Sequence, residues 1–174
     1  MQLIFFTSDL HFNHKNILKF QPEQRQASDI ADMNETIVKN WNKQVANTDT
    51  VYILGDIALG SKTKTKALLA RLNGIKHLVL GNHDQNVPMD AFASVSTYLE
   101  VTINGTFVVM FHYPIARWNK MHYGALHLFG HCHGSYTPEG RSMDVGIDSR
   151  NDMHLWSWQE VKELLENKEI LSSH

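Results

Sequence analysis

The sequence contains very little cysteine and no long apolar segment. Cys132 is the single cysteine among 174 residues, so no disulfide can form within the chain, and this favours a reducing compartment. No segment approaches the ~20 apolar residues of a membrane-spanning helix, and the N-terminus lacks the basic start and apolar stretch of a secretory signal. We therefore expect a cytoplasmic protein that does not bind membranes.

The chain also lacks an excess of charge of one sign. Its 16 Lys and Arg and 18 Asp and Glu residues give a formal net charge of -2. This balance provides no global basic field that would attract nucleic acid or an anionic membrane. Internal repeats, low-complexity segments and linkers are absent too, so the length predicts one domain over residues 1–174.

In the first half of the chain, apolar runs alternate with helical patterns. We expect buried strands at residues 3–7, 51–54 and 75–80. Helices are predicted at residues 30–45, capped by Asp29, and at residues 62–72. Polar residues follow each strand. This order is typical of an α/β arrangement whose site lies along the carboxyl edge of the sheet.

The second half predicts a further sheet. Asn104-Gly105 is a strong hairpin signal between strands at 99–103 and 106–110. Further strands are expected at residues 125–129 and 143–147, and Ser157 with Glu160 forms a capping box for a helix to about residue 167. The whole indicates two sheets flanked by helices. Residues 12–28 are polar and irregular, as in a loop near the site.

Five short clusters, each after an apolar run, contain metal-binding residue types. They are Asp9-Leu10-His11, Gly55-Asp56, Gly81-Asn82-His83-Asp84, Phe111-His112-Tyr113 and Gly130-His131-Cys132-His133. Alone, each has an ordinary explanation: chance or a helix cap, a turn, or a pair of surface histidines. Their joint occurrence, always after a strand, favours a site. The potential ligands are too many for one metal and suit two metals that share a carboxylate.

The ligand types indicate which metals would bind. Asp9 and His11 are two residues apart, so both point to one face of a strand. Asp56 can bridge two cations through its two oxygens, and Asn82 adds a neutral oxygen. Imidazole nitrogens come from His112, His131 and His133. Mixed oxygen and nitrogen ligands suit two divalent transition-metal ions (Mn, Fe, Zn or Ni) better than Ca²⁺ or Mg²⁺.

The order of these motifs resembles the calcineurin-like metallophosphoesterase superfamily, particularly its small single-domain bacterial or phage-type members, over residues 3–148. The resemblance implies an α/β sandwich: two mixed β-sheets packed face to face and flanked by helices in four layers. It also implies a division of ligands. Asp9, His11 and His133 would hold one metal, Asn82, His112 and His131 the other, and Asp56 would bridge them.

The same resemblance implies hydrolysis of a phosphate ester, more often a phosphodiester, by in-line attack of a metal-bridging hydroxide. His83 resembles the catalytic histidine that contacts the phosphate or protonates the leaving group; otherwise it would cap the following turn. A protein-binding scaffold of the same fold is the alternative, but such a scaffold would be free to lose ligands. A nuclease is a further alternative, although a broad basic surface is lacking. We expect a small phosphate-ester substrate, nucleic acid only as a substrate, and no obligate protein partner.

One position departs from related phosphoprotein phosphatases. They carry an acid, three residues after the Gly-Asp aspartate, that orients the catalytic histidine, and here that position is Leu59. Either another group, with Asp84 as the candidate, orients His83, or His83 is less basic than in those enzymes. This departure weakens the case for a protein phosphatase.

Several further residues are candidates for substrate contact. Arg117, His14 and Asn13 are predicted to bind substrate, since Arg117 can clamp a phosphate and the other two follow the first motif. Their alternative is a solvent-facing position. His122 and His127 are weaker candidates. A solvated face is expected to carry Lys62, Lys64 and Lys66. We expect Asp144 and Asp148 to lie behind the ligands or in turns.

Overall fold

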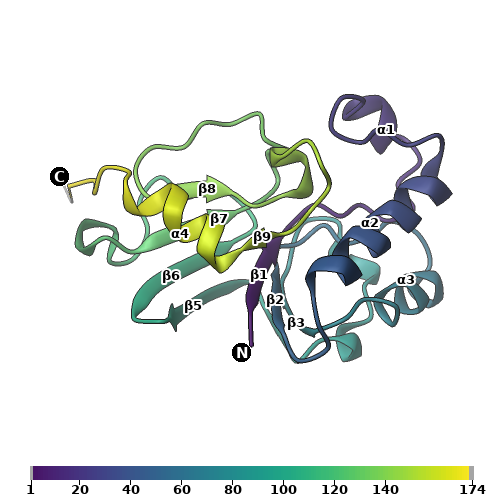
Figure 1. Cartoon of the computed structure of the whole chain (residues 1–174), viewed down its shortest axis with the longest axis horizontal. Coiled ribbons are helices and arrows are strands. Elements are labelled where there is room, and N and C mark those ends of the chain that lie inside the picture. Colours follow the sequence, from purple (N-terminus) through teal and green to yellow (C-terminus); the bar gives the residue numbers. More distant parts are fainter. Residues whose placement is uncertain (1, 173–174) are drawn as a thin grey trace.

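Two β-sheets packed face to face form the centre of the computed structural model, which describes residues 2–172 (Figure 1). The first sheet has the strand order β4-β3-β2-β1-β9. Its strands β1 to β4 are parallel and β9 is antiparallel to β1. Their bounds are β1 Ile4–Thr7, β2 Thr50–Ile53, β3 Ile75–Val79, β4 Ser94–Ser96 and β9 Trp156–Ser157.

The second sheet has the order β5-β6-β7-β8, with one antiparallel pair, β5 and β6. Both sheets are therefore mixed, as predicted. The bounds are β5 Tyr98–Ile103, β6 Thr106–Phe111, β7 Leu126–Phe129 and β8 Ser142–Asp144. The β5–β6 turn confirms the hairpin, because Asn104 and Gly105 have φ values of 47° and 84°, the left-handed region that a two-residue turn requires.

Two helices cover the outer face of the first sheet (Figure 1). They are α2 (Ile30–Gln44) and α3 (Lys62–Leu69). The Asp29 side chain caps α2 by accepting a hydrogen bond from the Asp32 amide at 2.9 Å. Met33, Ile37 and Trp41 lie on the buried face of α2 within one apolar cluster with β1 and β2. Each such side chain contributes about 1.5–3 kcal/mol on burial.

A second apolar cluster lies between the sheets, and α4 (Trp158–Glu166) packs on it through Trp158, Val161 and Leu165. The predicted capping box of Ser157 and Glu160 is present. The outer face of the second sheet is covered by Trp118, Met121 and Ala125, from a loop with one 3₁₀ turn, η3 (Met121–Tyr123). A loop therefore forms this outer layer where we expected a helix.

The main differences from the predictions are two element ends, one short helix and two short strands. β8 ends at Asp144 because that carboxylate accepts a hydrogen bond from the Gly146 amide at 2.7 Å, and the chain turns into η4 (Ile147–Ser149). Helix α3 is shorter than expected, and the polar segment 12–28 contains a one-turn helix, α1 (Ile17–Phe20). Strands β4 and β9 were not predicted, because two or three residues are too few for a pattern of alternation.

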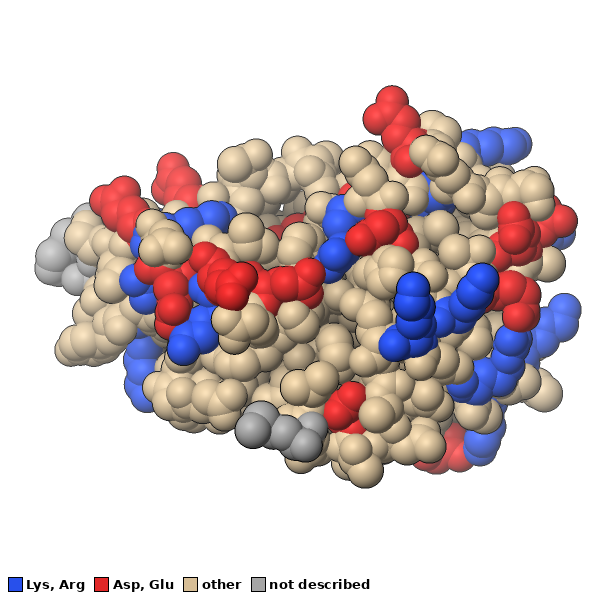
Figure 2. Space-filling model, viewed as in Figure 1, with Lys and Arg blue, Asp and Glu red and all other residues tan. Residues whose placement is uncertain are grey.

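The loops after β1, β2, β3, β6 and β7 all leave the sheets at their carboxyl ends. Isolated bridges join Ser8 to Gly146 and Phe12 to Ala58, and these bridges tie the loops together. Within residues 2–172, no helix is both long and apolar enough to cross a bilayer. On the face shown in Figure 2, acidic and basic side chains are interspersed.

Candidate metal centre

The predicted ligands lie in two adjacent groups. The ligand atoms of Asp9, His11 and His133 are within 4.8 Å of one another, and so are those of Asp56, His112 and His131. Asn82 joins the second group, since its Oδ1 is 3.0 Å from Nε2 of His112 and accepts a hydrogen bond from the Tyr113 hydroxyl at 3.3 Å. Residues from five separate loops thus meet at one sheet edge.

Asp56 stands between the two groups. Its Oδ2 is 3.7 Å from Nε2 of His11 and 3.6 Å from Nε2 of His112. Its Oδ1 accepts a hydrogen bond from the His83 amide at 2.9 Å. One oxygen, rather than the expected pair, therefore faces both groups.

Most of these ligands have an unusual backbone conformation. L-residues with positive φ are uncommon, because this conformation costs free energy. Such strained residues are concentrated at functional sites, where the position of the side chain justifies the cost. The φ values are 56° for Asp9, 48° for His11, 54° for Asp56, 68° for His131 and 49° for His133. Glycine would adopt these conformations with less strain. The presence of carboxylates and imidazoles here indicates that the side chains serve a function.

At two positions in the motifs, the backbone packs so closely against the predicted ligands that only glycine fits. A Cβ atom on Gly130 would overlap the side chain of Ser8 and lie 2.6 Å from Oδ2 of Asp9, the atom that accepts a hydrogen bond from the His131 amide at 2.9 Å. A Cβ atom on Gly81 would lie 2.6 Å from the Asp56 amide nitrogen. Any side chain at either position would displace a ligand carboxylate or its backbone.

The first group has the chemistry of a divalent metal site. Among the described residues, Oδ1 of Asp9 and both ring nitrogens of His11 are buried with no hydrogen-bond partner. Burial raises the pKa of Asp9 to about 7, and burial, with the positive charge of Arg25, lowers the pKa of His11 to about 2. Buried polar atoms without partners are costly, and a cation would satisfy them. These residues therefore fit a metal.

Hydrogen bonds at Nδ1 of two imidazoles turn their Nε2 atoms toward the predicted metal positions. His112 uses Nδ1 to contact the Leu54 carbonyl at 2.7 Å, and His133 uses Nδ1 to contact Oδ2 of Asp148 at 2.6 Å. Burial lowers the pKa of His133, but the Asp148 hydrogen bond and the negative charge of Asp9 outweigh it, so this pKa lies above its usual value. Asp148 thus supports a ligand, as expected.

Arg25 is the residue that the sequence did not reveal. It is 1% exposed, and its Nε and Nη2 atoms each lie 2.6 Å from an oxygen of Asp148. The same guanidinium donates to the carbonyl of Asp9 at 2.5 Å and to that of Leu10 at 2.9 Å. A lone arginine in a polar segment normally indicates solvent exposure, so the sequence holds no signal for this role.

Asp84 does not orient the His83 imidazole, contrary to our suggestion. Its buried carboxylate accepts hydrogen bonds from the amides of Asp56, Ile57 and Gly81 at 2.8–2.9 Å. His83 is exposed, and its Nε2 lies 3.9 Å from Oδ2 of Asp56. The Leu59 amide donates to the Phe12 carbonyl, which holds this loop against the first motif.

The predicted substrate residues are not all in one place. His14 lies beside the first group, with its ring 5.2 Å from that of His11. Asn13 instead pairs with Asn34 of α2 through two hydrogen bonds, of 3.2 and 3.0 Å. Arg117 is exposed, donates to the Ala116 carbonyl, and lines a small cavity that contains none of the predicted ligands.

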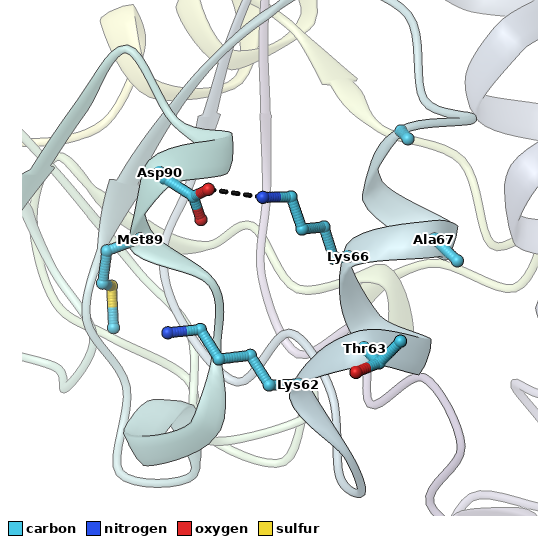
Figure 3. Close-up of a pocket in the computed structure, with 7 residues that line it drawn as sticks. Lys62, Thr63, Lys66, Ala67, Met89 and Asp90 are labelled. Atoms are coloured by element: carbon cyan, nitrogen blue, oxygen red, sulfur yellow. Dashed lines mark hydrogen bonds and ion pairs between the residues drawn. The ribbon is translucent and has the colours of Figure 1, made fainter.

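The lysines of α3 lie beside another cavity. Lys62 and Lys66 extend over a space of about 630 Å³ toward η2 (Met89–Ala91), and the Lys66 ammonium pairs with Asp90 (Figure 3). None of the predicted ligands lines this space. His127 is buried on β7, where its ring nitrogens contact the Ile115 amide and the Val109 carbonyl, so its role is structural.

The sequence pattern of the family described as calcineurin-like phosphoesterase matches residues 3–170. The chain belongs to this family. It is therefore a hydrolase of phosphoester bonds from a metal-dependent family, and the resemblance inferred from the five clusters is confirmed.

Several relatives align with most of the chain. The phosphoesterase is 32% identical over 160 residues to an uncharacterized protein of Methanocaldococcus jannaschii, with 87% of this chain and 85% of that protein covered. It is 31% identical to the gene 66 protein of Mycobacterium phage L5, with coverage of 86% and 88%. The crystal structure of a protein of unknown function from Aquifex aeolicus aligns with a TM-score of 0.74 at 25% identity, covering 95% of this chain and all of that one.

Proposed function

We propose that this phosphoesterase hydrolyses small phosphodiesters with the help of two divalent transition-metal ions. Asp9, His11 and His133 would hold one ion, and Asn82, His112 and His131 the other. The observation that carries the proposal is the position of Asp56, whose Oδ2 lies within 3.7 Å of an imidazole nitrogen from each group. A carboxylate oxygen between two imidazole-rich groups is what a shared ligand requires.

When bound, such a pair of cations offsets the charge of phosphate oxygens and lowers the pKa of a coordinated water. Mn, Fe, Zn or Ni would suit these mixed ligands. The left-handed backbone of Asp9, His11 and Asp56 holds the ligands in place before substrate arrives. Such preorganisation means that little reorganisation is needed during the reaction.

His83 is the residue that we propose for proton transfer to the leaving oxygen. Its amide is hydrogen-bonded to Asp56, so the backbone is fixed beside the shared ligand. Its side chain is 46% exposed, and Nε2 is available to a substrate at the surface. General acid catalysis of this kind typically contributes about 10²–10⁴ in rate.

The openness of the site supports a diester. Asn82, His83 and His131 are all exposed, so two ester groups can extend from one phosphorus atom without steric obstruction. The formal net charge of -2 provides no global basic field for a long nucleic acid, and acidic and basic side chains are interspersed on the face in Figure 2. A small diester, or the end of a nucleic acid, fits these features.

Hydrolysis of bis-p-nitrophenyl phosphate, compared with p-nitrophenyl phosphate, tests the proposal. Protein stripped with a chelator should be inactive, and addition of Mn²⁺, Ni²⁺ or Zn²⁺ should restore turnover, with a higher kcat/KM for the diester. Asp56→Asn should abolish the restored activity. Asp90→Asn is the matched control, because Asp90 is exposed and paired only with Lys66 of α3.

Two results would contradict the proposal. If folded wild-type protein showed no turnover of either ester with any metal, the two-metal mechanism would be untenable for these substrates. A clear preference for the monoester would overturn the diester assignment but leave the metal centre intact.

A further inference from the structure

The two ligand groups are supported in different ways. In the first, His133 contacts the carboxylate of Asp148, which is itself held by the fully buried side chain of Arg25. In the second, the Nδ1 atom of His112 contacts a backbone carbonyl rather than a charged group, and Asn82 and His131 are exposed. The first group is therefore enclosed by charged hydrogen bonds, whereas the second is open to solvent.

Arg25 connects both ends of the first group. Its guanidinium forms a two-pronged contact with Asp148, 2.6 Å for each prong, and through that carboxylate it reaches the His133 ring. Its remaining donors bind the carbonyls of Asp9 and Leu10 at 2.5 and 2.9 Å. One side chain thus fixes the strained Asp9 backbone and the orientation of the His133 imidazole together.

A buried ion pair of this kind is poorly explained by stability alone. Removing two charges from water is costly, and well-packed apolar residues of similar volume are often as stable or more so. Both side chains of the Arg25–Asp148 pair are 0% exposed. The geometry that the pair imposes on neighbouring ligands supplies a functional reason for its presence.

We propose that Arg25 and Asp148 are positioning residues that make the Asp9, His11 and His133 group the tighter of the two cation sites; this inference rests on the proposed function. The Asp148 carboxylate keeps the proton of His133 on Nδ1, so that Nε2 faces the cation. Outer partners of this kind typically contribute about 10–100-fold in metal affinity. A lysine cannot replace Arg25, because an ammonium has three donors on one atom and lacks the planar fork that here contacts four oxygen atoms at once.

Calorimetric titration of the full chain with Mn²⁺, after removal of metal, tests this inference. Wild-type protein should bind in two steps of unequal affinity. Arg25→Lys and Asp148→Asn should each weaken the tighter step about 10–100-fold and leave the weaker step unchanged. His133→Ala and His131→Ala assign the steps, since these neighbouring histidines belong to different groups.

Arg71→Lys is the matched control. Arg71 makes the same two-pronged contact, with Glu35 at 2.7 and 2.6 Å, but on the surface. The Arg71→Lys variant should bind Mn²⁺ in the same two steps and with the same affinities as the wild type. Thermal unfolding without metal, followed by circular dichroism, establishes that each variant is folded, and Asp148→Asn provides the test if Arg25→Lys does not fold.

The outcomes separate this inference from the proposed function. If the wild type bound no Mn²⁺ at all, the two-metal proposal and this inference would fall together. If the wild type bound Mn²⁺ in two steps, three results with the Arg25 and Asp148 variants would overturn this inference alone. Both affinities could be unchanged, both could fall equally, or only the weaker step could be lost.

Discussion

The Asp84 carboxylate accepts a hydrogen bond from the Asp56 amide at 2.9 Å, and so fixes the peptide that carries the proposed shared ligand. The same carboxylate binds the amides of Ile57 and Gly81. In Asp84→Asn, an NH₂ group would face at least one of these donors. We expect a loss of about 2 kcal/mol or more in the free energy of unfolding, measured with urea, together with lower activity. Asp90→Asn should have neither effect.

Gly130→Ala should damage the first ligand group selectively. The added Cβ would overlap the buried Ser8 side chain and lie 2.6 Å from Oδ2 of Asp9, and this carboxylate cannot move without losing its hydrogen bond to the His131 amide. We expect at least a tenfold loss of Mn²⁺ affinity at the tighter step and about 1–3 kcal/mol of destabilisation. Gly105→Ala is the control for Mn²⁺ binding, because Gly105 lies in the β5–β6 turn and outside both ligand groups; its φ of 84° makes alanine destabilising there as well. Unchanged Mn²⁺ binding by Gly130→Ala would show that the added methyl group does not displace the Asp9 carboxylate.

His83→Ala should lower kcat by about 10²–10⁴ without changing Mn²⁺ affinity, because His83 belongs to neither ligand group. The loss should be larger for a diester with an alkoxide leaving group than for a nitrophenyl diester, since nitrophenolate departs without a proton. The measurement is kcat for both substrates in wild type and variant. His122→Ala, at an exposed position on η3, serves as the control. An equal loss for both leaving groups would argue against proton donation.

His127 should make the fold less stable in mild acid. Burial lowers its pKa from 6.5 to about 4, so the unfolded chain binds a proton between these values while the folded chain does not. Stability is therefore complete above pH 6.5 and falls as the pH drops toward 4. Between pH 7 and pH 5 the loss amounts to about 2 kcal/mol.

Urea unfolding of wild type and His127→Gln at both pH values measures this effect. The wild type should lose about 2 kcal/mol more than the variant, whatever the difference in their absolute stabilities. Groups such as Asp9 titrate in both proteins and cancel in the comparison. If the free energy of unfolding of the two proteins changed equally with pH, the acid sensitivity would belong to another group.

The sequence predicted the sandwich and the seven candidate ligands because both depend on local patterns. Each ligand follows an apolar strand, and the carboxyl ends of neighbouring parallel strands meet at one edge. Arg25 could not be predicted in the same way, because its burial depends on Asp148, 123 residues further along the chain. The placement of Arg117 and Asn13 likewise depends on loop packing, which leaves no periodic signal.

The separation of Arg25 from Asp148 also bears on how the protein is made. A ribosome releases the N-terminal strands and Arg25 well before Asp148 is synthesised, so for that interval the guanidinium has no carboxylate to neutralise it. The Asp9 loop therefore lacks the full set of Arg25 and Asp148 contacts until Asp148 has been made. The centre is assembled only after strands β1 to β8, which precede Asp148 in the chain, have been synthesised.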